Sequence, residues 1–341
     1  MLMRAALLEK EKTFRIIEVA NPEPGKDEVV IQVLRTGICG SEIEAFYGRH
    51  PFRKPPVITG HEMSGVISKI GEGVTGFRLG ERVTLEPQVA CGSCTYCRTG
   101  RYNLCRGRMS LGTAKWPGPF GEFIKAPAST LIRIPDGLSM DEAVLLEPLA
   151  VGFHAVRRTR LGRGESLVVF GGGTIGLCVM AAAMAIGVDP IIITDISEPK
   201  LKIAGEMGAR LVVNPRTQNL LEEVKQLLPE GADVAIVATG VPGAYRSSTK
   251  VVRRDGRVGV VGLCREEILT PIDIGGPGPE LEVIGCTAYV NVDFRDAMGI
   301  LPEGKLGKLI SRVYPIERIQ EAFETFIREN DTLIKVILSH R

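Results

Sequence analysis

Up to about Pro135 the chain alternates short apolar runs with glycines and prolines. Runs of this length between turn-forming residues are typical of β-strands, and their close spacing predicts a mainly β, barrel-like domain. The start of the chain alternates in the same way and predicts a strand pair. The clearest runs that follow lie at residues 28–37, 65–71, 81–85 and 122–127.

After Ser139 the period of the apolar residues changes from that of a strand to that of a helix. The segment 139–158 has Ser139 in the N-cap position and Glu142 three residues later, which together form a capping-box pair. Pro148 interrupts this pattern, because proline lacks the backbone N–H that a helix interior uses. We therefore expect two helices, separated at Pro148.

From Glu165 onward, apolar strands alternate with helical segments. This alternation predicts an α/β fold with a parallel, doubly wound sheet that ends at about Cys286. The expected strands lie at residues 166–173 (which run into a glycine-rich turn), 190–197, 210–214, 232–240 and 257–263.

The tail of the chain continues with two helices, at residues 293–301 and 316–327, and a last strand at 333–340. Five apolar residues of the second helix share one face, as in an ordinary core stripe: Ile316, Ile319, Phe323, Phe326 and Ile327. We expect the tail to return to the first domain. The predicted domains are then 1–146, completed by 287–341, and 147–286.

The composition argues against several classes of partner. The chain has 341 residues, of which 24% are charged and 44% hydrophobic, and its formal net charge is +2. A charge so near zero gives no attraction to nucleic acid or to a membrane surface, and no apolar run reaches the ~18 residues of a membrane span. Because the start does not resemble a secretory signal, the eight cysteines indicate metal binding and packing in a reducing cytoplasm.

The sharpest chemical signal is a cluster of four cysteines in one loop-like stretch: Cys91, Cys94, Cys97 and Cys105. Four thiolates so close can surround one ion tetrahedrally. A site of four soft sulfurs with no open position is typical of structural zinc. The alternative interpretation is a pair of disulfides or an accidental cluster.

Residues 171–176 read G-G-G-T-I-G and fit the dinucleotide pattern G-x-G-x-x-G between a strand and a helix. A helix N-terminus at this point attracts the phosphates of a cofactor. Asp195 follows at about the expected ~20 residues, where a carboxylate binds ribose hydroxyls and repels a 2′-phosphate, so the sequence favours NAD over NADP. The predicted cofactor contacts are Gly171, Gly173, Thr174, Ile175, Gly176 and Asp195.

A second metal site is suggested by Cys39, His61 and Glu62. One thiolate, one imidazole and one carboxylate leave a fourth tetrahedral position for water or substrate, which is the catalytic arrangement of zinc. Glu147 is a further carboxylate, either the alternative third ligand or a group that binds the metal's water. The alternative interpretation is a buried core thiol at Cys39 and a surface pair at His61 and Glu62.

The chain resembles the zinc-containing medium-chain dehydrogenases of the alcohol and polyol dehydrogenase superfamily over essentially its whole length. The stretch 60–74, GHEMSGVISKIGEGV, matches that family's signature, and the cysteine loop, glycine pattern and order of segments match as well. The resemblance implies a GroES-like catalytic domain and a Rossmann NAD-binding domain. It implies a structural zinc on the four cysteines and a catalytic zinc on Cys39 and His61, with Glu62 in the third place as in sorbitol dehydrogenase-like members.

The same resemblance assigns further roles. Asp195 and Lys200 match residues that hold the adenosine ribose, and Ser41 matches the hydroxyl that passes the alcohol proton toward solvent. Ser41 as a turn serine bonded to backbone is the alternative. The histidine that usually ends this relay is replaced by Glu44, which is then the proton exit or faces a polar substrate. Glu147 occupies the place of a zinc cysteine in liver-type alcohol dehydrogenases, and relatives are homodimers or homotetramers.

The substrate pocket departs from that of sorbitol dehydrogenases, whose Tyr and Arg are replaced by Ala45 and Ala288. We expect NAD-dependent oxidation of a secondary alcohol in a polyol, sugar acid or similar small metabolite. A threonine-type amino-alcohol dehydrogenase and a non-catalytic NAD-binding redox sensor are the alternatives. The candidate pocket residues are Glu44, Phe46, Asp293 and Arg295.

Three histidines remain outside these sites. We expect His154 to be a packed helix residue, and His50 and His340 to be exposed in a loop and in the tail.

Overall fold

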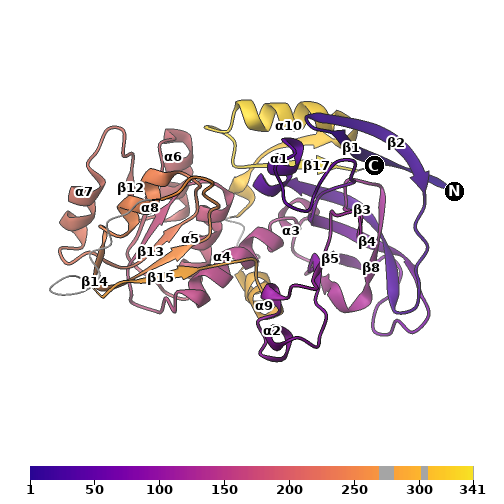
Figure 1. The fold of residues 1–341 in the computed structure, drawn as a ribbon, viewed down its shortest axis with the longest axis horizontal. Helices are drawn as coiled ribbons and strands as arrows, with labels where there is room; N and C mark the ends of the chain where they lie inside the picture. Colours follow the sequence, from indigo (N-terminus) through magenta and orange to yellow (C-terminus); the bar gives the residue numbers. More distant parts are fainter. Residues whose placement is uncertain (269–279, 301–305, 341) are drawn as a thin grey trace. The chain divides into compact units, whose positions relative to one another are not determined.

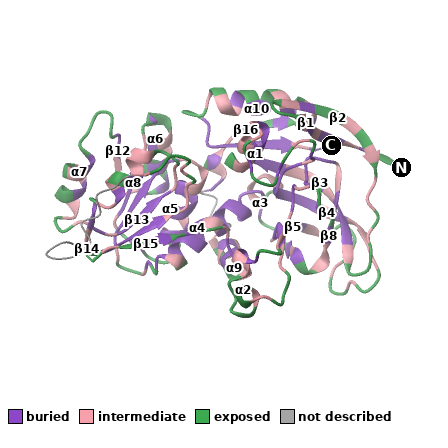
Figure 2. Cartoon of the chain, viewed as in Figure 1, coloured by how far each residue is buried: buried purple, intermediate pink, exposed green. Residues whose placement is uncertain are grey.

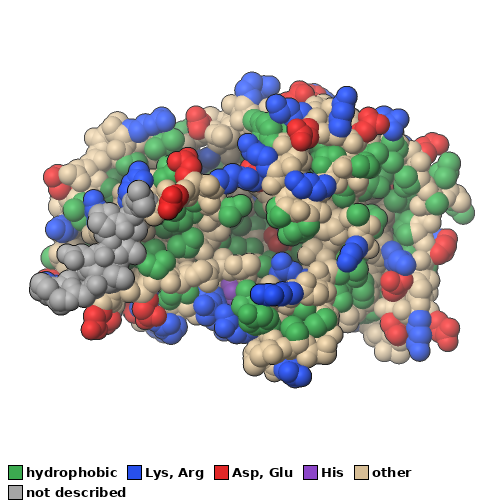
Figure 3. Space-filling view, in the orientation of Figure 1, with side chains coloured by type: hydrophobic (Ala, Val, Ile, Leu, Met, Phe, Trp, Pro, Cys, Tyr) green, Lys and Arg blue, Asp and Glu red, His purple; other side chains and the backbone are tan. Residues whose placement is uncertain are grey.

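The computed structural model describes residues 1–268, 280–300 and 306–340, and it divides into two compact units (Figure 1). Met1–Glu147 and the described residues after 305 form the first unit, and Pro148–Ile300 belongs to the second. No helix within the described ranges is long and apolar enough to cross a membrane. On the face drawn in Figure 3, Lys and Arg side chains lie among Asp and Glu side chains, in keeping with the net charge of +2.

The first unit is built on a seven-stranded sheet in the order β16-β17-β3-β4-β5-β9, with β8 paired to β3. Because β17 pairs antiparallel with β3, the tail of the chain does return to the first unit, as the sequence predicts. The strands are β3 (Glu28–Ile38), β4 (Glu62–Ile70), β5 (Arg82–Leu85), β8 (Phe123–Pro127), β9 (Leu131–Arg133), β16 (Ile310–Pro315) and β17 (Lys335–Ser339).

Smaller elements surround this sheet. The strand pair predicted at the start of the chain is the hairpin of β1 (Leu2–Lys10) and β2 (Thr13–Ala20), and a second pair joins β6 (Gln88–Val89) to β7 (Met109–Ser110). The helices are α1 (Gly40–Phe46), α2 (Thr95–Arg98), α3 (Met140–Ala143) and α10 (Ile319–Arg328), with 3-10 turns at Tyr102–Leu104, Ala128–Thr130, Leu306–Leu309 and Ile316–Arg318.

An aromatic core joins β2, α1 and α10. The ring centroid of Phe14 lies 4.6 Å from that of Phe323, in a tilted pair, and 5.8 Å from that of Phe46, in a stacked pair. Phe120 packs edge-on against Phe14 and Phe323, an arrangement that suits the quadrupoles of the rings. Phe46 is therefore a core residue, and its prediction as a pocket residue was wrong because sequence pattern does not separate the two kinds of burial.

The second unit contains the predicted doubly wound sheet. Its six strands are all parallel, in the order β12-β11-β10-β13-β14-β15. Every residue of β10 and β11 is buried (Figure 2), as strands covered on both faces require. The strands are β10 (Leu167–Phe170), β11 (Ile191–Thr194), β12 (Leu211–Val213), β13 (Ala232–Val237), β14 (Val252–Val260) and β15 (Glu282–Gly285). The helices are α4 (Leu146–Arg158), α5 (Thr174–Ala185), α6 (Glu198–Met207), α7 (Leu220–Leu227), α8 (Pro242–Ser248) and α9 (Asn291–Ile300).

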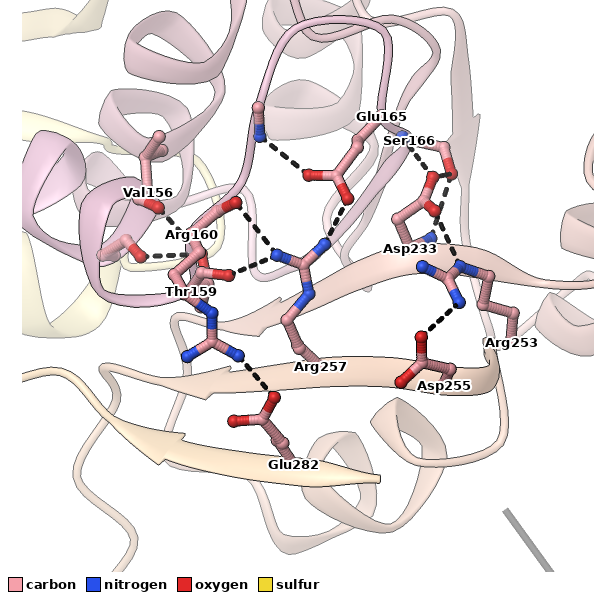
Figure 4. A network of polar contacts seen from close by, with 12 residues as sticks. Val156, Thr159, Arg160, Glu165, Ser166, Asp233, Arg253, Asp255, Arg257 and Glu282 are labelled. Atoms are coloured by element: carbon pink, nitrogen blue, oxygen red, sulfur yellow. Dashed lines mark hydrogen bonds and ion pairs between the residues drawn. The ribbon is translucent and has the colours of Figure 1, made fainter. Parts of the chain in front are cut away.

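A buried arginine joins the C-terminal end of α4 to the sheet (Figure 4). Nη1 of Arg257 on β14 donates to the carbonyls of Thr159 (2.8 Å) and Arg160 (2.9 Å), and Nη2 pairs with Glu165. These carbonyls belong to the end of a helix, where backbone acceptors lack partners and a cation is favoured. The contact fixes α4 against the strand that carries Arg257.

The helix after Ser139 differs from the prediction at Pro148. The capping box is present, since the Glu142 N–H donates to Oγ of Ser139 (3.1 Å), but α3 ends before Val144. Pro148 lies in the first turn of α4, where its missing N–H would have no helical partner in any case. The prediction of a break at Pro148 was therefore wrong by a few residues.

The second domain extends further than the sequence predicts, because α9 belongs to it. Asp293 on α9 is fully buried and accepts hydrogen bonds from Nδ1 of His154 and Nε of Arg157, both at 2.8 Å. Phe294 and Ala297 of the same helix are also fully buried. The assignment of 287–300 to the first domain was wrong, and Asp293 is committed to α4 instead of being open to a substrate.

His340 is buried in the first unit, so its expected exposure was also wrong. Its backbone N–H donates to the carbonyl of Leu34, and its ring nitrogen Nε2 lies 3.3 Å from Oγ1 of Thr36 on β3. Burial lowers the pKa of His340 to about 4. From the sequence alone, a polar residue after the last strand is expected to be exposed. The burial of His340 follows only from the pairing of that strand with β3.

Candidate functional site

The four cysteines converge in one loop of the first unit. All four Sγ atoms lie within 4.8 Å of one another, and the Sγ of Cys97 is 3.9 Å from that of Cys91 and 3.4 Å from that of Cys94. A tetrahedral site with Zn–S bonds of about 2.3 Å needs sulfurs about 3.8 Å apart, so the loop fits one zinc ion. All eight cysteines of the chain are free thiols, and the disulfide alternative is not realised.

The loop prepares its sulfurs unequally for a metal. The backbone amides of Ser93 and Cys94 lower the pKa of Cys91 to about 6. Burial and the neighbouring thiol of Cys94 raise the pKa of Cys97 to about 12. One sulfur is thus a ready thiolate at neutral pH, whereas another needs the charge of a metal ion to lose its proton.

Cys39, His61 and Glu62 lie at the ends of β3 and β4, where the two strands pair. Cys39 follows β3 and is the N-cap of α1, and the antiparallel register places Gly37 opposite Glu62. A Cβ on Gly37 would lie 1.9 Å from Oε2 of Glu62, so a larger residue there would require this carboxylate to move away from Lys335. The β ladder therefore brings together residues that the sequence separates. We call Cys39, His61, Glu62 and Glu147 the catalytic corner.

Carboxylates face both ring nitrogens of His61. Nδ1 lies 2.7 Å from Oε1 of Glu42, a fully buried residue in the first turn of α1, and Nε2 lies 3.8 Å from Oε1 of Glu147. Because Glu42 occupies Nδ1, Nε2 is the nitrogen left to face a metal. The ligand atoms of His61, Glu62 and Glu147 lie within 4.8 Å of one another, as do those of Cys39, Glu42 and His61.

Glu62 is paired with a lysine that lies 273 residues further along the chain. Nζ of Lys335 on β17 lies 2.8 and 2.7 Å from the two carboxylate oxygens, and it also donates to the carbonyl of Ile38 (3.2 Å). Both side chains are almost fully buried. Each carboxylate oxygen has more than one lone pair, so the ion pair holds Glu62 in place without excluding a metal.

Glu42 and His61 each shift the pKa of the other toward its charged form. Burial alone would raise the pKa of Glu42, but His61 and Arg53 lower it to about 2. Burial also opposes a charge on His61, yet Glu42 and Glu147 raise its pKa well above the usual value. Zinc and a proton compete for a histidine nitrogen, so the affinity of this site for zinc would depend on pH.

Ser41 lies in α1 and contacts Arg53. Nη1 of Arg53 donates to Oγ of Ser41 (3.2 Å), and this oxygen lies 3.5 Å from Oε2 of Glu42. The predicted proton exit, Glu44, pairs instead with Arg49 at 2.9 Å, and its role stays a prediction. Ser41 is thus connected to the buried charges around His61, and it is more than a turn serine bonded to backbone.

His50 is buried, so its expected exposure was wrong. Its Nδ1 accepts the N–H of Arg53 (3.0 Å), and its Nε2 lies 3.3 Å from Nη1 of the same residue. Burial and the charge of Arg53 lower the pKa of His50 to about 4. The imidazole is therefore neutral at physiological pH.

The glycine loop of the second unit has the geometry that its pattern predicts. Gly171 has φ +108°, in the region that favours glycine, and a Cβ on Gly176 would lie 1.7 Å from the carbonyl oxygen of Gly171. Gly173 is the N-cap of α5, and a Cβ there would meet nothing within 4 Å. The open side of Gly173, next to Thr174 and Ile175, is suited to the approach of a pyrophosphate.

Asp195 follows β11 and lies beside this loop. Its Oδ2 accepts the N–H of Gly172 (2.6 Å), and its Oδ1 accepts the N–H of Ser197 (2.8 Å), so the partly exposed carboxylate is held in one orientation. Lys200 on α6 lies close by, since a Cβ on Gly172 would be 3.2 Å from Cβ of Lys200. The structure thus brings the predicted dinucleotide contacts together.

Two family models match the chain: the alcohol dehydrogenase GroES-like domain over residues 25–136 and the zinc-binding dehydrogenase domain over residues 174–302. The chain is also 36% identical to sorbitol dehydrogenase of Bacillus subtilis (strain 168), with 98% of this chain and 97% of that protein covered. The chain belongs to the zinc-binding alcohol dehydrogenase family. L-idonate 5-dehydrogenase of Vitis vinifera is 32% identical over 98% of this chain and 94% of its own length. The solved structure of 2R,3R-butanediol dehydrogenase from Bacillus subtilis matches with a TM-score of 0.90 at 30% identity, covering 99% of each chain.

Membership of the zinc-binding alcohol dehydrogenases confirms the predicted fold class and the predicted enzyme class. One similar dehydrogenase structure contains NADH and another contains NADP. The comparison therefore indicates a nicotinamide dinucleotide but does not decide between NAD and NADP. That choice depends on residues of this chain.

Sequence reasoning missed three charged residues of this zinc-binding alcohol dehydrogenase: Glu42, Arg53 and Lys335. Glu42 had a signal, because an acidic residue three positions after Cys39 fits a helix start. Lys335 also had a signal, because it is the single charged residue in β17. Arg53 had none, since one of its partners, the carbonyl of Leu111, lies 58 residues away in the sequence.

Proposed function

We propose that this enzyme oxidises a secondary alcohol of a small polyol or sugar acid to the ketone, with NAD as hydride acceptor. The observation that supports it most directly is the placement of His61, whose ligand atom lies within 4.8 Å of those of Glu62 and Glu147 and, in a second group, of those of Cys39 and Glu42. Such a donor set suits zinc and leaves a position for the substrate oxygen. The names of the relatives, sorbitol dehydrogenase and L-idonate 5-dehydrogenase, point to the same substrate class.

Two zinc ions per chain are part of the proposal. Cys39, His61 and Glu62 hold the catalytic ion, and Glu147 binds its water or takes the place of Glu62. The four cysteines of the loop hold the structural ion. Metal analysis tests the assignment: Glu62→Gln should lose about one of the two zinc ions, while Glu147→Gln should retain both. The reverse result would make Glu147 the third ligand.

When bound, zinc supplies Lewis acidity that lowers the pKa of the alcohol. Ser41 would accept the proton of the alcohol and pass it toward solvent, and a bound NAD would supply the acceptor for the hydride that leaves the alcohol carbon. The products are the ketone, NADH and one proton. Glu42 orients His61 throughout, because it holds Nδ1 at 2.7 Å.

The preference for NAD rests on Asp195. Its oriented carboxylate accepts hydrogen bonds from ribose hydroxyls and repels a 2′-phosphate. Asp195→Ala should weaken NAD binding by roughly tenfold, through lost hydrogen bonds to a charged group, and should leave NADP binding equal or better. Titration of nucleotide fluorescence measures both. Equal losses for the two nucleotides would contradict the ribose role.

The reaction itself is tested with the zinc-loaded enzyme and NAD on polyols, sugar acids, diols and threonine, by following NADH formation. A polyol or a sugar acid should be oxidised fastest. A clear preference for threonine would instead establish the amino-alcohol alternative. No turnover with two zinc ions bound and NADH held tightly would favour the non-catalytic alternative.

We further propose a homodimer or homotetramer in a reducing cytoplasm. β15 is an edge strand of the six-stranded sheet, and Val283 on it is 54% exposed, so two copies can pair edge to edge across a two-fold axis. Eight free thiols suit a reducing compartment. Light scattering tests the assembly, and a monomer at micromolar concentration would contradict it.

A further inference from the structure

Arg53 is a buried arginine in the segment between α1 and β4. Only 6% of the residue is exposed, whereas its neighbours Phe52 and Lys54 are exposed. An arginine is rarely buried without a counter-ion, because the cost of removing its charge from water has to be offset. The contacts of Arg53 in the structure offset it only in part.

Its hydrogen-bond partners are neutral groups. Nη1 donates to Oγ of Ser41 (3.2 Å) and lies 3.3 Å from Nε2 of His50, and Nη2 donates to the carbonyl of Leu111 (3.2 Å). Nε is buried and makes no hydrogen bond with any residue that the structure describes. The guanidinium has five N–H donors in a planar fork, so part of its donor capacity is unused.

The nearest carboxylate serves another residue. Oε1 of Glu42 lies 3.8 Å from Nε of Arg53 but 2.7 Å from Nδ1 of His61, and Oε2 accepts the N–H of Cys39 (3.2 Å). Glu42 is thus shared between Arg53 and a zinc ligand. The positive charge of Arg53 is therefore only partly paired among the residues that the structure describes.

The position of Arg53 defines where that partner lies. Ser41 is the hydroxyl that accepts the alcohol proton, and Arg53 donates to the same oxygen at 3.2 Å. With a further hydrogen bond of about 2.8 Å, donated by the alcohol to Ser41, the guanidinium is within about 6 Å of the reacting oxygen. A group at that distance is two or three carbons from the carbon that is oxidised.

We propose that Arg53 makes this enzyme select hydroxy acids, with a carboxylate two or three carbons from the alcohol that is oxidised, over neutral polyols. The inference rests on the proposed function, since it names the substrate class within it. A carboxylate matches the planar fork of arginine, which binds it through two parallel charge-assisted hydrogen bonds. The bound carboxylate also supplies the anion that Glu42 supplies only in part.

The test compares gluconate with sorbitol, which differ only in whether C1 is a carboxylate or an alcohol. Zinc-loaded wild type should have a higher kcat/KM for gluconate, and Arg53→Gln should lower the gluconate-to-sorbitol ratio by roughly 10- to 100-fold, the usual worth of hydrogen bonds to a charged group. Arg53→Lys, which keeps the charge but not the fork, should give an intermediate ratio. Lys54→Gln removes an exposed cation next in the chain and should leave the ratio as in wild type.

The other outcomes are distinct. Equal losses on both substrates in Arg53→Gln would make Arg53 a positioning residue for Glu42 and overturn the inference. A wild type that oxidises sorbitol but shows no preference for gluconate would also overturn it, while the proposed function would stand. If the enzyme preferred sorbitol 6-phosphate to gluconate, the anionic group that Arg53 binds would be a phosphate, and the assignment of a carboxylate would be overturned. If no alcohol is oxidised, the proposed function fails as well.

Zinc content and NADH affinity separate these effects from the cofactors. Both should be the same in Arg53→Gln as in wild type, because Arg53 contacts no zinc ligand directly in the described structure. Weakened NADH binding would show that Arg53 serves the cofactor phosphates, and would overturn the inference. If Arg53→Gln does not fold, the ratio in Arg53→Lys decides, and a ratio equal to that of wild type counts against the carboxylate fork.

Discussion

The two candidate metal sites of the first unit differ in what holds their ligands in place. The four cysteines lie in one loop, and three of them are exposed or partly exposed. The catalytic corner draws its residues from the ends of β3 and β4 and from α4, and buried charges on α1 and β17 lie beside it. The loop owes its geometry to chain connectivity and the corner to tertiary packing. A change beside the corner should therefore cost far more than a change beside the loop.

The largest expected effect separates the two sites by activity. Cys39→Ser should lower kcat/KM by on the order of a thousandfold, because it removes a proposed ligand of the metal that would polarise the alcohol. Cys97→Ser should lose one zinc ion and lower the thermal midpoint, but should retain most activity per folded molecule. Activity and zinc content are measured on both.

Equal losses of activity in the two variants would break this comparison. It would then follow that the cysteine loop shapes the reacting site directly. NADH affinity is the internal control, since neither cysteine belongs to the second unit.

The next effect concerns the buried ion pair. Lys335→Met should lower the free energy of unfolding by about 3–5 kcal/mol, because it leaves the carboxylate of Glu62 buried without its partner. Denaturant unfolding at fixed zinc concentration measures this. The double variant with Glu62→Gln should recover part of the loss, since no charge is then left unpaired. A single variant as stable as wild type would mean that water or metal replaces the lysine.

A smaller effect depends on pH and concerns the strand pair that carries Lys335. The pKa of His340 falls from 6.5 to about 4 on folding, so the unfolded chain binds the proton more readily. The contribution of His340 to the free energy of unfolding is complete above pH 6.5 and is lost as pH falls toward 4. At pH 5 this free energy is lower by about 2 kcal/mol than at neutral pH. Burial is the first cause, and the surrounding charges on Glu122, Glu317, Arg35 and Arg4 partly cancel.

His340→Gln is the matched control for this prediction, because it cannot titrate and can keep the contact with Thr36. The difference in unfolding free energy between wild type and variant should shift by that amount between pH 7 and pH 5. Since zinc loss in acid affects both proteins alike, a pH-independent difference would show that His340 does not titrate in this range.

The smallest effect belongs to the cysteine loop. Tyr102 donates a hydrogen bond to Oε2 of Glu86 at 3.2 Å and connects the loop to the rest of the unit. Tyr102→Phe should lower the unfolding free energy by about 1 kcal/mol, the usual net value of one such bond. A loss as large as that of Lys335→Met would mean that the loop is as tightly coupled to the core as the catalytic corner.

The same contrast explains what the sequence could predict. The cysteine loop and the glycine loop are local, so spacing alone identified their residues. In the corner, Cys39, His61 and Glu62 were recognisable by residue type, but Lys335 was not, because only the pairing of β17 with β3 brings it near. Burial of His340 was missed for the same reason, whereas Arg53 and His50 are buried against each other in the segment between α1 and β4.

The fold was predictable to a similar extent. Strand–helix alternation identified the parallel sheet, and the apolar last strand indicated its return to the first unit. The position of α9 was not predictable, because it depends on the ion pair of Asp293 with Arg157 and its contact with His154. A helix with one apolar face carries no sign of which domain it covers.

The pairing of Glu62 with Lys335 also sets an order of events during synthesis. The 273 residues between them take roughly 14 to 55 s to translate at 5–20 residues per second, and the whole second unit is made in that interval. Cys39, His61 and Glu62 emerge early and wait for β17 without the lysine that neutralises Glu62. The second unit can therefore fold first, and the first unit is completed last, when β17 has been made. A ribosome stalled before residue 335 would thus carry a nucleotide-binding domain beside an unfinished metal site.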